Sequence, residues 1–159
     1  MQSSYTLTTG FNRTKPTVLV AEDSPEIQRY LRRLLELDGY RVEVASSGEE
    51  ALQLMGAGSA ASLAVLDWQM PGIDGLETLQ RLRELRPGLK VIMCSGVDDP
   101  DRIREAVLAG ADAYVVKPVR HLYLSAAVQH CLAGDVAEPT PPLPKTRTMA
   151  LVPPSFLPS

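Results

Sequence analysis

Five side chains able to bind a cation or a phosphate group stand at the ends of short apolar segments. Glu22 and Asp23 follow the first segment, Asp67 ends the third, Ser95 follows the fourth, and Lys117 follows the fifth. If these segments are parallel strands, their carboxyl ends meet at one edge of a sheet. We therefore expect three carboxylates, a hydroxyl and an ammonium group to face one another at that edge.

This combination of groups points to phosphoryl chemistry. Clustered carboxylates need a cation, because like charges in close contact raise one another's pKa. Oxygen ligands without a nearby His or Cys favour Mg²⁺, which also pairs with phosphate oxygens. A carboxylate beside such a cation and a lysine can accept a phosphoryl group, and Ser95 can donate a hydrogen bond to it. Taken singly, each residue could be an ordinary helix cap, turn residue or solvated lysine; the joint placement favours a site.

The elements that would position these residues alternate along the chain. Most of the apolar runs are nearly continuous, as expected for parallel strands covered on both faces, whereas 41–45 alternates and suits an edge strand. The predicted strands are Thr17–Glu22, Arg41–Ala45, Leu63–Leu66, Lys90–Cys94 and Ala113–Val116.

A helix is predicted after each strand. The start signals are Ser24 before Pro25, capping boxes at Ser47 with Glu50 and at Asp74 with Glu77, and Asp99 before Pro100. The last helix, at about residues 120–132, is more apolar than one buried stripe requires, which often indicates a protein interface. Five strand–helix units in succession predict an α/β fold with a doubly wound, five-stranded parallel sheet and helices on both faces, a three-layer sandwich.

We expect one domain with two extensions. Residues 1–16 are polar and predicted to be a loose arm, and residues 17–133 carry the periodic pattern. Residues 134–159 hold seven of the 13 prolines, which predicts an extended or disordered tail.

Composition narrows the classes of function. A net charge of −3 without a basic run argues against nucleic acid and against a membrane surface. Apolar runs are too short to span a bilayer, and the first residues lack the pattern of a secretory signal. Cys94 and Cys131 have no metal-type spacing and are expected to be reduced core thiols in a cytoplasmic protein.

Residues 17–133 resemble a response-regulator receiver domain of two-component phosphorelays, of the single-domain chemotaxis type. The resemblance rests on the segments VLVAEDSPEIQRYLRRLLELDGYRVEVASSGEEAL, LAVLDWQMPGIDGLETLQRLRE, VIMCSG and GADAYVVKPV, which occur in order. It implies a flavodoxin-like sheet with strand order 2-1-3-4-5.

The resemblance also assigns the site. Asp67 would be the phosphoacceptor, and the Mg²⁺ ligands would be Asp23 directly, Glu22 through water, Asp67 itself and the backbone carbonyl of Gln69. Lys117 and Ser95 would contact the phosphoryl oxygens, and the bond from Lys117 to Pro118 would be cis. Ser95 and Tyr114 would form the switch, with Tyr114 turning toward the core after phosphorylation. The sequence has Glu-Asp in place of Asp-Asp at the acidic pair and Ser in place of Thr at the switch hydroxyl, and both variants fit these roles.

The implied function is phosphorylation-activated signalling in bacteria. A histidine kinase or histidine phosphotransfer protein would phosphorylate Asp67, and a downstream protein would recognise the changed surface of the fourth helix, fifth strand and fifth helix. The same surface could form a homodimer, although the fifth helix lacks the charged pattern of many dimeric regulators. The domain would catalyse only its own phosphorylation and dephosphorylation. Alternatives are a phosphotransfer intermediate or phosphate sink, the receiver fragment of a larger regulator, and a module that works without phosphorylation, against which the intact site argues.

Overall fold

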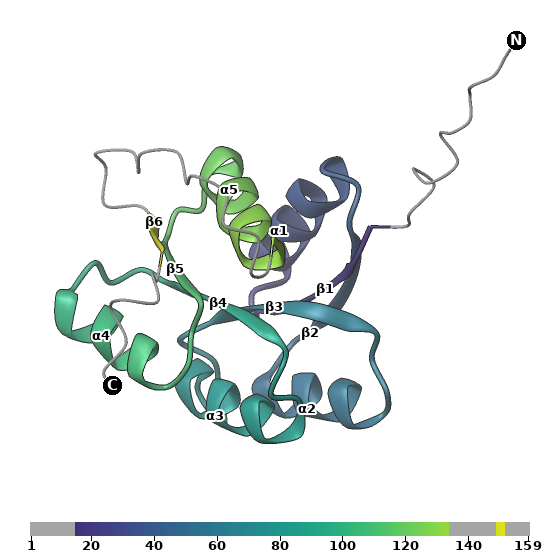
Figure 1. Cartoon of the computed structure of the whole chain (residues 1–159), viewed down its shortest axis with the longest axis horizontal. Coiled ribbons are helices and arrows are strands. Elements are labelled where there is room, and N and C mark those ends of the chain that lie inside the picture. Colours follow the sequence, from purple (N-terminus) through teal and green to yellow (C-terminus); the bar gives the residue numbers. More distant parts are fainter. Residues whose placement is uncertain (1–14, 134–148, 152–159) are drawn as a thin grey trace, which may run out of the picture.

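The computed structural model describes residues 15–133 and 149–151 and contains one six-stranded sheet (Figure 1). The strand order is β2-β1-β3-β4-β5-β6, and β1 to β5 pair in parallel. The order 2-1-3-4-5 predicted for the parallel strands is therefore confirmed. The strands are β1 (Thr17–Ala21), β2 (Arg41–Ala45), β3 (Ala61–Asp67), β4 (Lys90–Ser95), β5 (Ala113–Val116) and β6 (Met149–Leu151).

Five helices cover the sheet on both faces, which confirms the three-layer architecture. In Figure 1, α1 and α5 lie on one side of the sheet and α2, α3 and α4 lie on the other. The helices are α1 (Pro25–Leu37), α2 (Gly48–Gly56), α3 (Gly75–Leu85), α4 (Pro100–Leu108) and α5 (His121–Leu132).

Strand burial follows the apolar pattern of the sequence. β1, β3 and β4 are buried along almost their whole length, because helices cover both of their faces. β2, with its alternating sequence, is partly exposed and lies at the edge of the sheet, as predicted.

The helix starts occur at the predicted caps. The hydroxyl of Ser47 accepts a hydrogen bond from the backbone N–H of Glu50 at 3.0 Å. The carboxylate of Glu50 then accepts from the N–H of Ser46 at 2.6 Å rather than from that of Ser47, so the capping box closes one residue earlier than expected. At α3 only the first half of the box forms, since Asp74 caps Glu77 but Glu77 pairs with Arg81.

The apolar excess of α5 is mostly absorbed by the core. One face of the sheet packs with α1 and α5 into a cluster that includes Leu31, Leu35 and Val128, and the other face packs with α2, α3 and α4. α5 buries Tyr123, Leu124, Ala127, Val128 and Cys131. Of its larger apolar residues only Leu122 is strongly exposed, at 75%. The composition of α5 therefore reflects packing on the sheet more than an unpartnered surface.

A short strand in the C-terminal tail was not predicted. β6 pairs antiparallel with β5, with Tyr114 opposite Ala150. The three residues of β6 contain no proline, whereas prolines occur at 144 and 153 on either side. An edge position suits such a segment, because only one side of its backbone must join the ladder. The rest of the tail and residues 1–14 lie outside the described residues, and so does most of what was predicted for both extensions.

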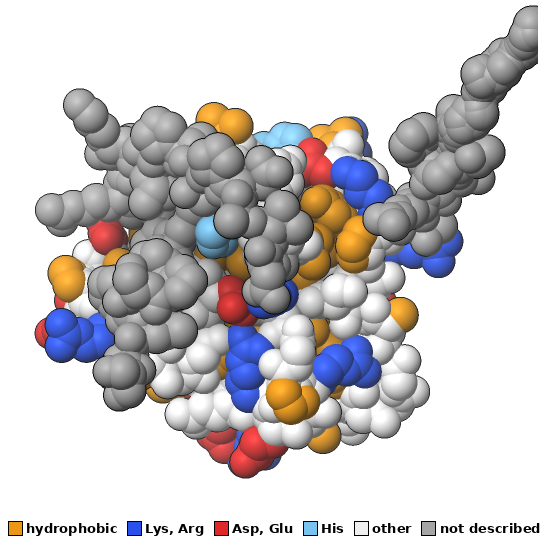
Figure 2. Space-filling view, viewed as in Figure 1, with side chains coloured by type: hydrophobic (Ala, Val, Ile, Leu, Met, Phe, Trp, Pro, Cys, Tyr) orange, Lys and Arg blue, Asp and Glu red, His pale blue; other side chains and the backbone are white. Residues whose placement is uncertain are grey.

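Charges of both signs are interspersed on the face of the molecule shown in Figure 2. None of the helices in the described ranges combines the length and the apolarity needed to cross a membrane.

Burial predicts that both thiols are inert in the folded protein. It raises the pKa of Cys94 and of Cys131 from 9.0 to about 12, which lowers the thiolate fraction roughly a thousandfold. Iodoacetamide at pH about 8 should therefore alkylate neither cysteine until urea unfolds the chain, as intact mass would report. Because both pKa values are raised in the folded state, the stability that the neutral thiols contribute is complete below pH about 9 and is lost as the pH rises toward about 12. Equal rates of iodoacetamide labelling with and without urea would contradict the prediction that both thiols are inert in the folded protein.

Candidate functional site

The carboxyl ends of β1, β3, β4 and β5 border a cleft of about 780 Å³. Parallel strands direct their last residues and the following loops to the same edge of the sheet, and the chain places polar groups there. The lining residues are Glu22, Asp23, Ser24, Ile27, Asp67, Trp68, Gln69, Met70, Pro71, Asp74, Gly96, Arg102 and Lys117.

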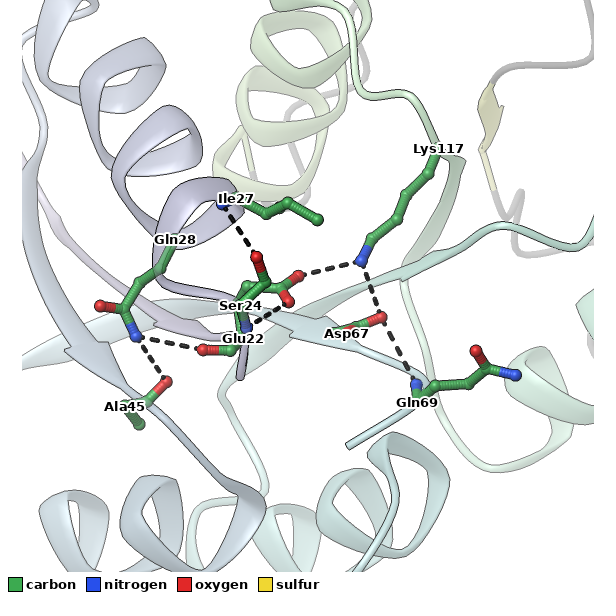
Figure 3. A network of polar contacts seen from close by, with 8 residues as sticks. All are labelled: Glu22, Ser24, Ile27, Gln28, Ala45, Asp67, Gln69 and Lys117. Atoms are coloured by element: carbon green, nitrogen blue, oxygen red, sulfur yellow. Dashed lines mark hydrogen bonds and ion pairs between the residues drawn. The ribbon is translucent and has the colours of Figure 1, made fainter. Parts of the chain in front are cut away.

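Asp67 lies at the floor of this cleft. It is the last residue of β3, and its side chain is 8% exposed. The Nζ atom of Lys117 lies 3.0 Å from its Oδ1 atom, and the backbone N–H of Gln69 donates to the same oxygen at 3.4 Å (Figure 3). The carboxylate is thus held by one ammonium and one backbone donor, with the cleft open before it.

Glu22 is buried beside Asp67, with a side chain that is 1% exposed. Its Oε1 atom accepts a hydrogen bond from Lys117 at 2.9 Å, and its Oε2 atom accepts one from the backbone N–H of Ser24 at 3.0 Å. Burial raises the pKa of Glu22 and the charge of Asp67 adds to this rise, against the opposing hydrogen bonds from Ser24 and Lys117. Burial acts against the Lys117 ammonium, but its bonds to Glu22 and Asp67 outweigh that effect and raise the pKa of Lys117.

Three carboxylates converge in this part of the cleft. Glu22, Asp23 and Asp67 each offer an oxygen, and these oxygens lie within 4.8 Å of one another. Asp23 is exposed, so the cluster faces solvent on its side. One ammonium does not balance three carboxylates, and an all-oxygen donor set with an open side is what a hard divalent cation requires. The site is therefore an acidic pocket whose residues fit such a cation.

The loop that carries the acidic pair is held by a residue that the sequence did not single out. The side-chain amide of Gln28, in the first turns of α1, donates to the carbonyl oxygens of Glu22 at 3.1 Å and of Ala45 at 3.2 Å (Figure 3). It thereby joins the carboxyl ends of β1 and β2. The only signal in the sequence for this role of Gln28 was a polar residue just after the start of a predicted helix that follows a strand end.

Ser95 and Tyr114 bond to the loop between β4 and α4. The hydroxyl of Ser95, which is buried at the end of β4, accepts from the backbone N–H of Val97 at 3.2 Å. Tyr114 donates its hydroxyl to the carbonyl oxygen of Val97 at 2.7 Å and is fully buried, and this burial raises its pKa. The inward position expected for Tyr114 after phosphorylation is therefore the position that the structure already has.

An aromatic pair connects Asp67 to α4. Trp68, next to Asp67, meets Tyr114 edge to face with ring centres 6.4 Å apart. The guanidinium of Arg102 lies over the ring of Trp68, 4.5 Å from the centre of that ring. Arg102 was not predicted, because it is one of several charged residues on α4.

Lys117 reaches the cleft from the end of β5. The peptide bond between Lys117 and Pro118 is cis, as expected. The structure thus brings Glu22, Asp23, Asp67, Gln69 and Lys117 into one cleft, with Ser95 and Tyr114 bonded to the adjoining loop.

A five-stranded parallel sheet in this order, with an acidic cluster beyond β1 and β3 and a lysine beyond β5, defines the class of receiver domains. The chain belongs to this family: the profile of the response regulator receiver domain matches residues 18–129.

Two curated relatives carry the same domain in longer proteins. The chain is 36% identical over 125 residues to the transcriptional regulatory protein AfsQ1 of Streptomyces coelicolor, covering 79% of this chain and 55% of that protein. It is 30% identical over 120 residues to a cyclic di-GMP phosphodiesterase of Thermotoga maritima, covering 76% of this chain and 32% of that protein. The chain thus spans between about a third and just over half of these relatives.

A solved structure matches the fold over nearly its whole length. The CheY-like response regulator receiver domain protein of Methanospirillum hungatei superimposes with a TM-score of 0.70 at 32% identity, covering 75% of this chain and 94% of that one.

Removing the positive charge of Lys117 and removing the negative charge of Asp67 should change the free energy of unfolding in opposite directions. Without divalent cations, Lys117→Met leaves the buried Glu22 and Asp67 uncompensated and should lower the free energy of unfolding by on the order of 2 kcal/mol. Asp67→Asn relieves the repulsion among the carboxylates and should raise it by about 1 kcal/mol. Urea denaturation in EDTA measures both, with Asp101→Asn on exposed α4 surface as the control. A Lys117→Met protein as stable as wild type would contradict the conclusion that Lys117 compensates the charges of Glu22 and Asp67.

The start of α3 presses on the backbone of Asp67, which makes Gly75 intolerant of any side chain. A methyl group there would lie 2.3 Å from the carbonyl oxygen of Asp67 and 2.8 Å from the Cα atom of Trp68. Gly75→Ala should therefore lower stability by about 1–3 kcal/mol and alter the fluorescence of Trp68. Gly56→Ala, where nothing lies within 4 Å, is the matched control and should be neutral or stabilising. Equal stability of the two variants would refute this account of the packing.

Proposed function

We propose that this chain is a phosphorylation-activated receiver in which Asp67 accepts a phosphoryl group from a histidine kinase or a histidine phosphotransfer protein. The observation that carries this proposal is the carboxylate of Asp67, nearly buried, 3.0 Å from Lys117 and beside two further carboxylates at the floor of an open cleft. A buried carboxylate with one oxygen bonded to a lysine and the cleft open before it supports a role in the attack on phosphorus.

Mg²⁺ fits the donor set and would be held by Glu22, Asp23, Asp67 and the backbone carbonyl of Gln69. When bound, the ion would neutralise negative charge on the transferring phosphoryl group. Lys117 would contact a phosphoryl oxygen, since its ammonium already bonds the Asp67 carboxylate that carries the group. Gln28 and Ser24 hold the β1–α1 loop, so the acidic pair is positioned before a donor arrives.

Transfer would form one bond and break one bond. An oxygen of Asp67 attacks phosphorus, and the bond from phosphorus to the donor nitrogen or oxygen breaks. The leaving group takes the bonding electron pair. A phosphohistidine whose other ring nitrogen already carries a proton leaves as neutral imidazole, so this step needs no further proton donor. The reaction needs no other enzyme activity of this chain, and the phosphoaspartate is the product.

Ser95 and Tyr114 would transmit the change. In the structure both bond to Val97, so the loop between β4 and α4 is held by the residues expected to act as the switch. A phosphoryl group on Asp67 would accept a hydrogen bond from the Ser95 hydroxyl, and turning that side chain toward Asp67 would take its oxygen away from the N–H of Val97. A downstream protein would then recognise the altered surface of α4, β5 and α5 in the cytoplasm. Signal transmission requires that the phosphoryl group bonds better in one arrangement of this loop than in the other.

Phosphorylation itself provides the test. Wild type incubated with Mg²⁺ and acetyl phosphate should gain one acid-labile phosphoryl group by intact mass, and Asp67→Asn should gain none. If the asparagine variant were labelled equally, Asp67 would not be the acceptor.

Metal binding is tested separately from transfer. Mg²⁺ should raise the midpoint of thermal unfolding of wild type, because a ligand that binds only the folded state stabilises it. Asp23→Asn should lose most of this shift, while Asp101→Asn, which removes the same charge outside the cleft, should keep it. A full shift in Asp23→Asn would exclude Asp23 as a ligand.

A further inference from the structure

Arg102 is a cation in the cleft that the proposed chemistry has not used. It is the third residue of α4, and it lines the cleft together with Asp67 and Lys117. It lies 4.5 Å from the centre of the ring of Trp68, a side chain that is nearly buried. The face of Trp68 therefore holds a positive charge at the α4 side of the site.

Arg102 forms no ion pair with a carboxylate within the described ranges. None of the six ion pairs found there includes Arg102, although Asp98, Asp99 and Asp101 are its neighbours in sequence. Asp99 instead caps α4 by accepting from the N–H of Asp101 at 3.1 Å. Lys117, the other cation of the cleft, is already shared between Glu22 and Asp67.

A phosphoryl donor meets unfavourable charge when it enters this cleft. Four carboxylates line it (Glu22, Asp23, Asp67 and Asp74) against two cations. A phosphoryl group is itself anionic, so it needs positive charge that is not already engaged. A guanidinium suits this task, because its planar set of N–H donors matches two phosphate oxygens.

We propose that Arg102 forms an anion subsite that binds the phosphoryl group of an incoming donor before its transfer to Asp67. The ligand class is a phosphoryl group on an acyl or a nitrogen leaving group, and the inference rests on the proposed function of Asp67. Arg102 leaves the ring of Trp68 to meet the donor and is a binding residue, separate from the acceptor and its cation. With acetyl phosphate, the P–O bond to the acetyl group breaks, acetate departs with the electron pair, and the new P–O bond to Asp67 forms.

The competing explanation is that Arg102 stacks on Trp68 only to stabilise the fold. A guanidinium over an indole ring stabilises the fold whether or not a donor binds. The two explanations differ in what they predict for donor concentration, because packing alone does not change the half-saturating concentration of a donor.

The matched variants are Arg102→Gln and Arg104→Gln. Arg104 is an exposed arginine of the same helix outside the cleft lining, so its loss changes the net charge equally. Initial rates of phosphorylation are measured against acetyl phosphate concentration at saturating Mg²⁺. Arg102→Gln should raise the half-saturating concentration by roughly two- to fivefold, the range for one partly exposed charge contact, with an unchanged limiting rate. Arg104→Gln should match wild type, and Arg102→Lys should recover part of the loss.

Two further arms identify the interaction as electrostatic. Phosphoramidate, which carries less negative charge than acetyl phosphate and releases ammonia, should show a smaller effect of Arg102→Gln. Added salt should raise the half-saturating concentration of wild type more than that of Arg102→Gln, because ions screen the contact.

Trp68 supplies a readout that does not depend on transfer. It is the single tryptophan of the chain. In an Asp67→Asn background, which accepts no phosphoryl group, acetyl phosphate should change Trp68 emission as Arg102 moves off the ring. The double variant Asp67→Asn with Arg102→Gln should show no saturable change.

The outcomes separate this inference from the proposed function. If wild type is phosphorylated on Asp67 but Arg102→Gln and Arg104→Gln have the same half-saturating concentration, the subsite is refuted and the acceptor stands. A lower limiting rate with unchanged half-saturation also refutes it. If wild type gains no phosphoryl group, both fail together. Urea denaturation of each variant confirms that the comparison concerns folded protein.

Discussion

Mutual repulsion of three carboxylates at one edge of a parallel sheet is the constraint around which this molecule is organised. Glu22, Asp23 and Asp67 offer oxygens within 4.8 Å of one another, and two of these residues are buried. Such an arrangement would not persist on flexible loops. It is held because β1 and β3 are adjacent central strands, and because Lys117 reaches across from β5 to bond two of the carboxylates. The fold keeps an excess of negative charge that a divalent cation can relieve.

The surroundings of Asp67 form a continuous set of contacts rather than an isolated pocket. Trp68 follows Asp67 in the chain, packs edge to face on Tyr114 and carries Arg102 on its face. Tyr114 bonds to Val97, which belongs to the loop leading into α4. Asp67 is therefore linked to α4 through the aromatic pair of Trp68 and Tyr114. The start of α3 presses on the backbone of Asp67 at Gly75. Rigid packing of this kind favours discrete alternative arrangements over gradual deformation.

Much of this could be predicted from the sequence, because local signals and the global fold agree. Continuous apolar runs gave the central strands, the alternating run gave β2 at the edge, and four side-chain caps marked the helix starts. The features that were missed depend on residues far apart in the chain. Gln28 matters because β1 and β2 end beside it, and Arg102 matters because α4 packs next to Trp68. The inward position of Tyr114 likewise depends on Val97, and no pattern within β5 reveals it.

The last strand has a consequence for how the sheet can grow. A sheet edge exposes a row of N–H and C=O groups that can pair with a strand from another chain. At β5 that row is occupied by the chain's own residues 149–151, opposite Ala113 to Val115. A partner that recognised this end of the sheet by strand addition would first have to displace β6, whereas a partner that contacted only helix surfaces would not. A partner that adds a strand at β5 must therefore overcome the free energy of pairing of residues 149–151. A partner that contacts only helices does not, so β6 favours recognition through the helices.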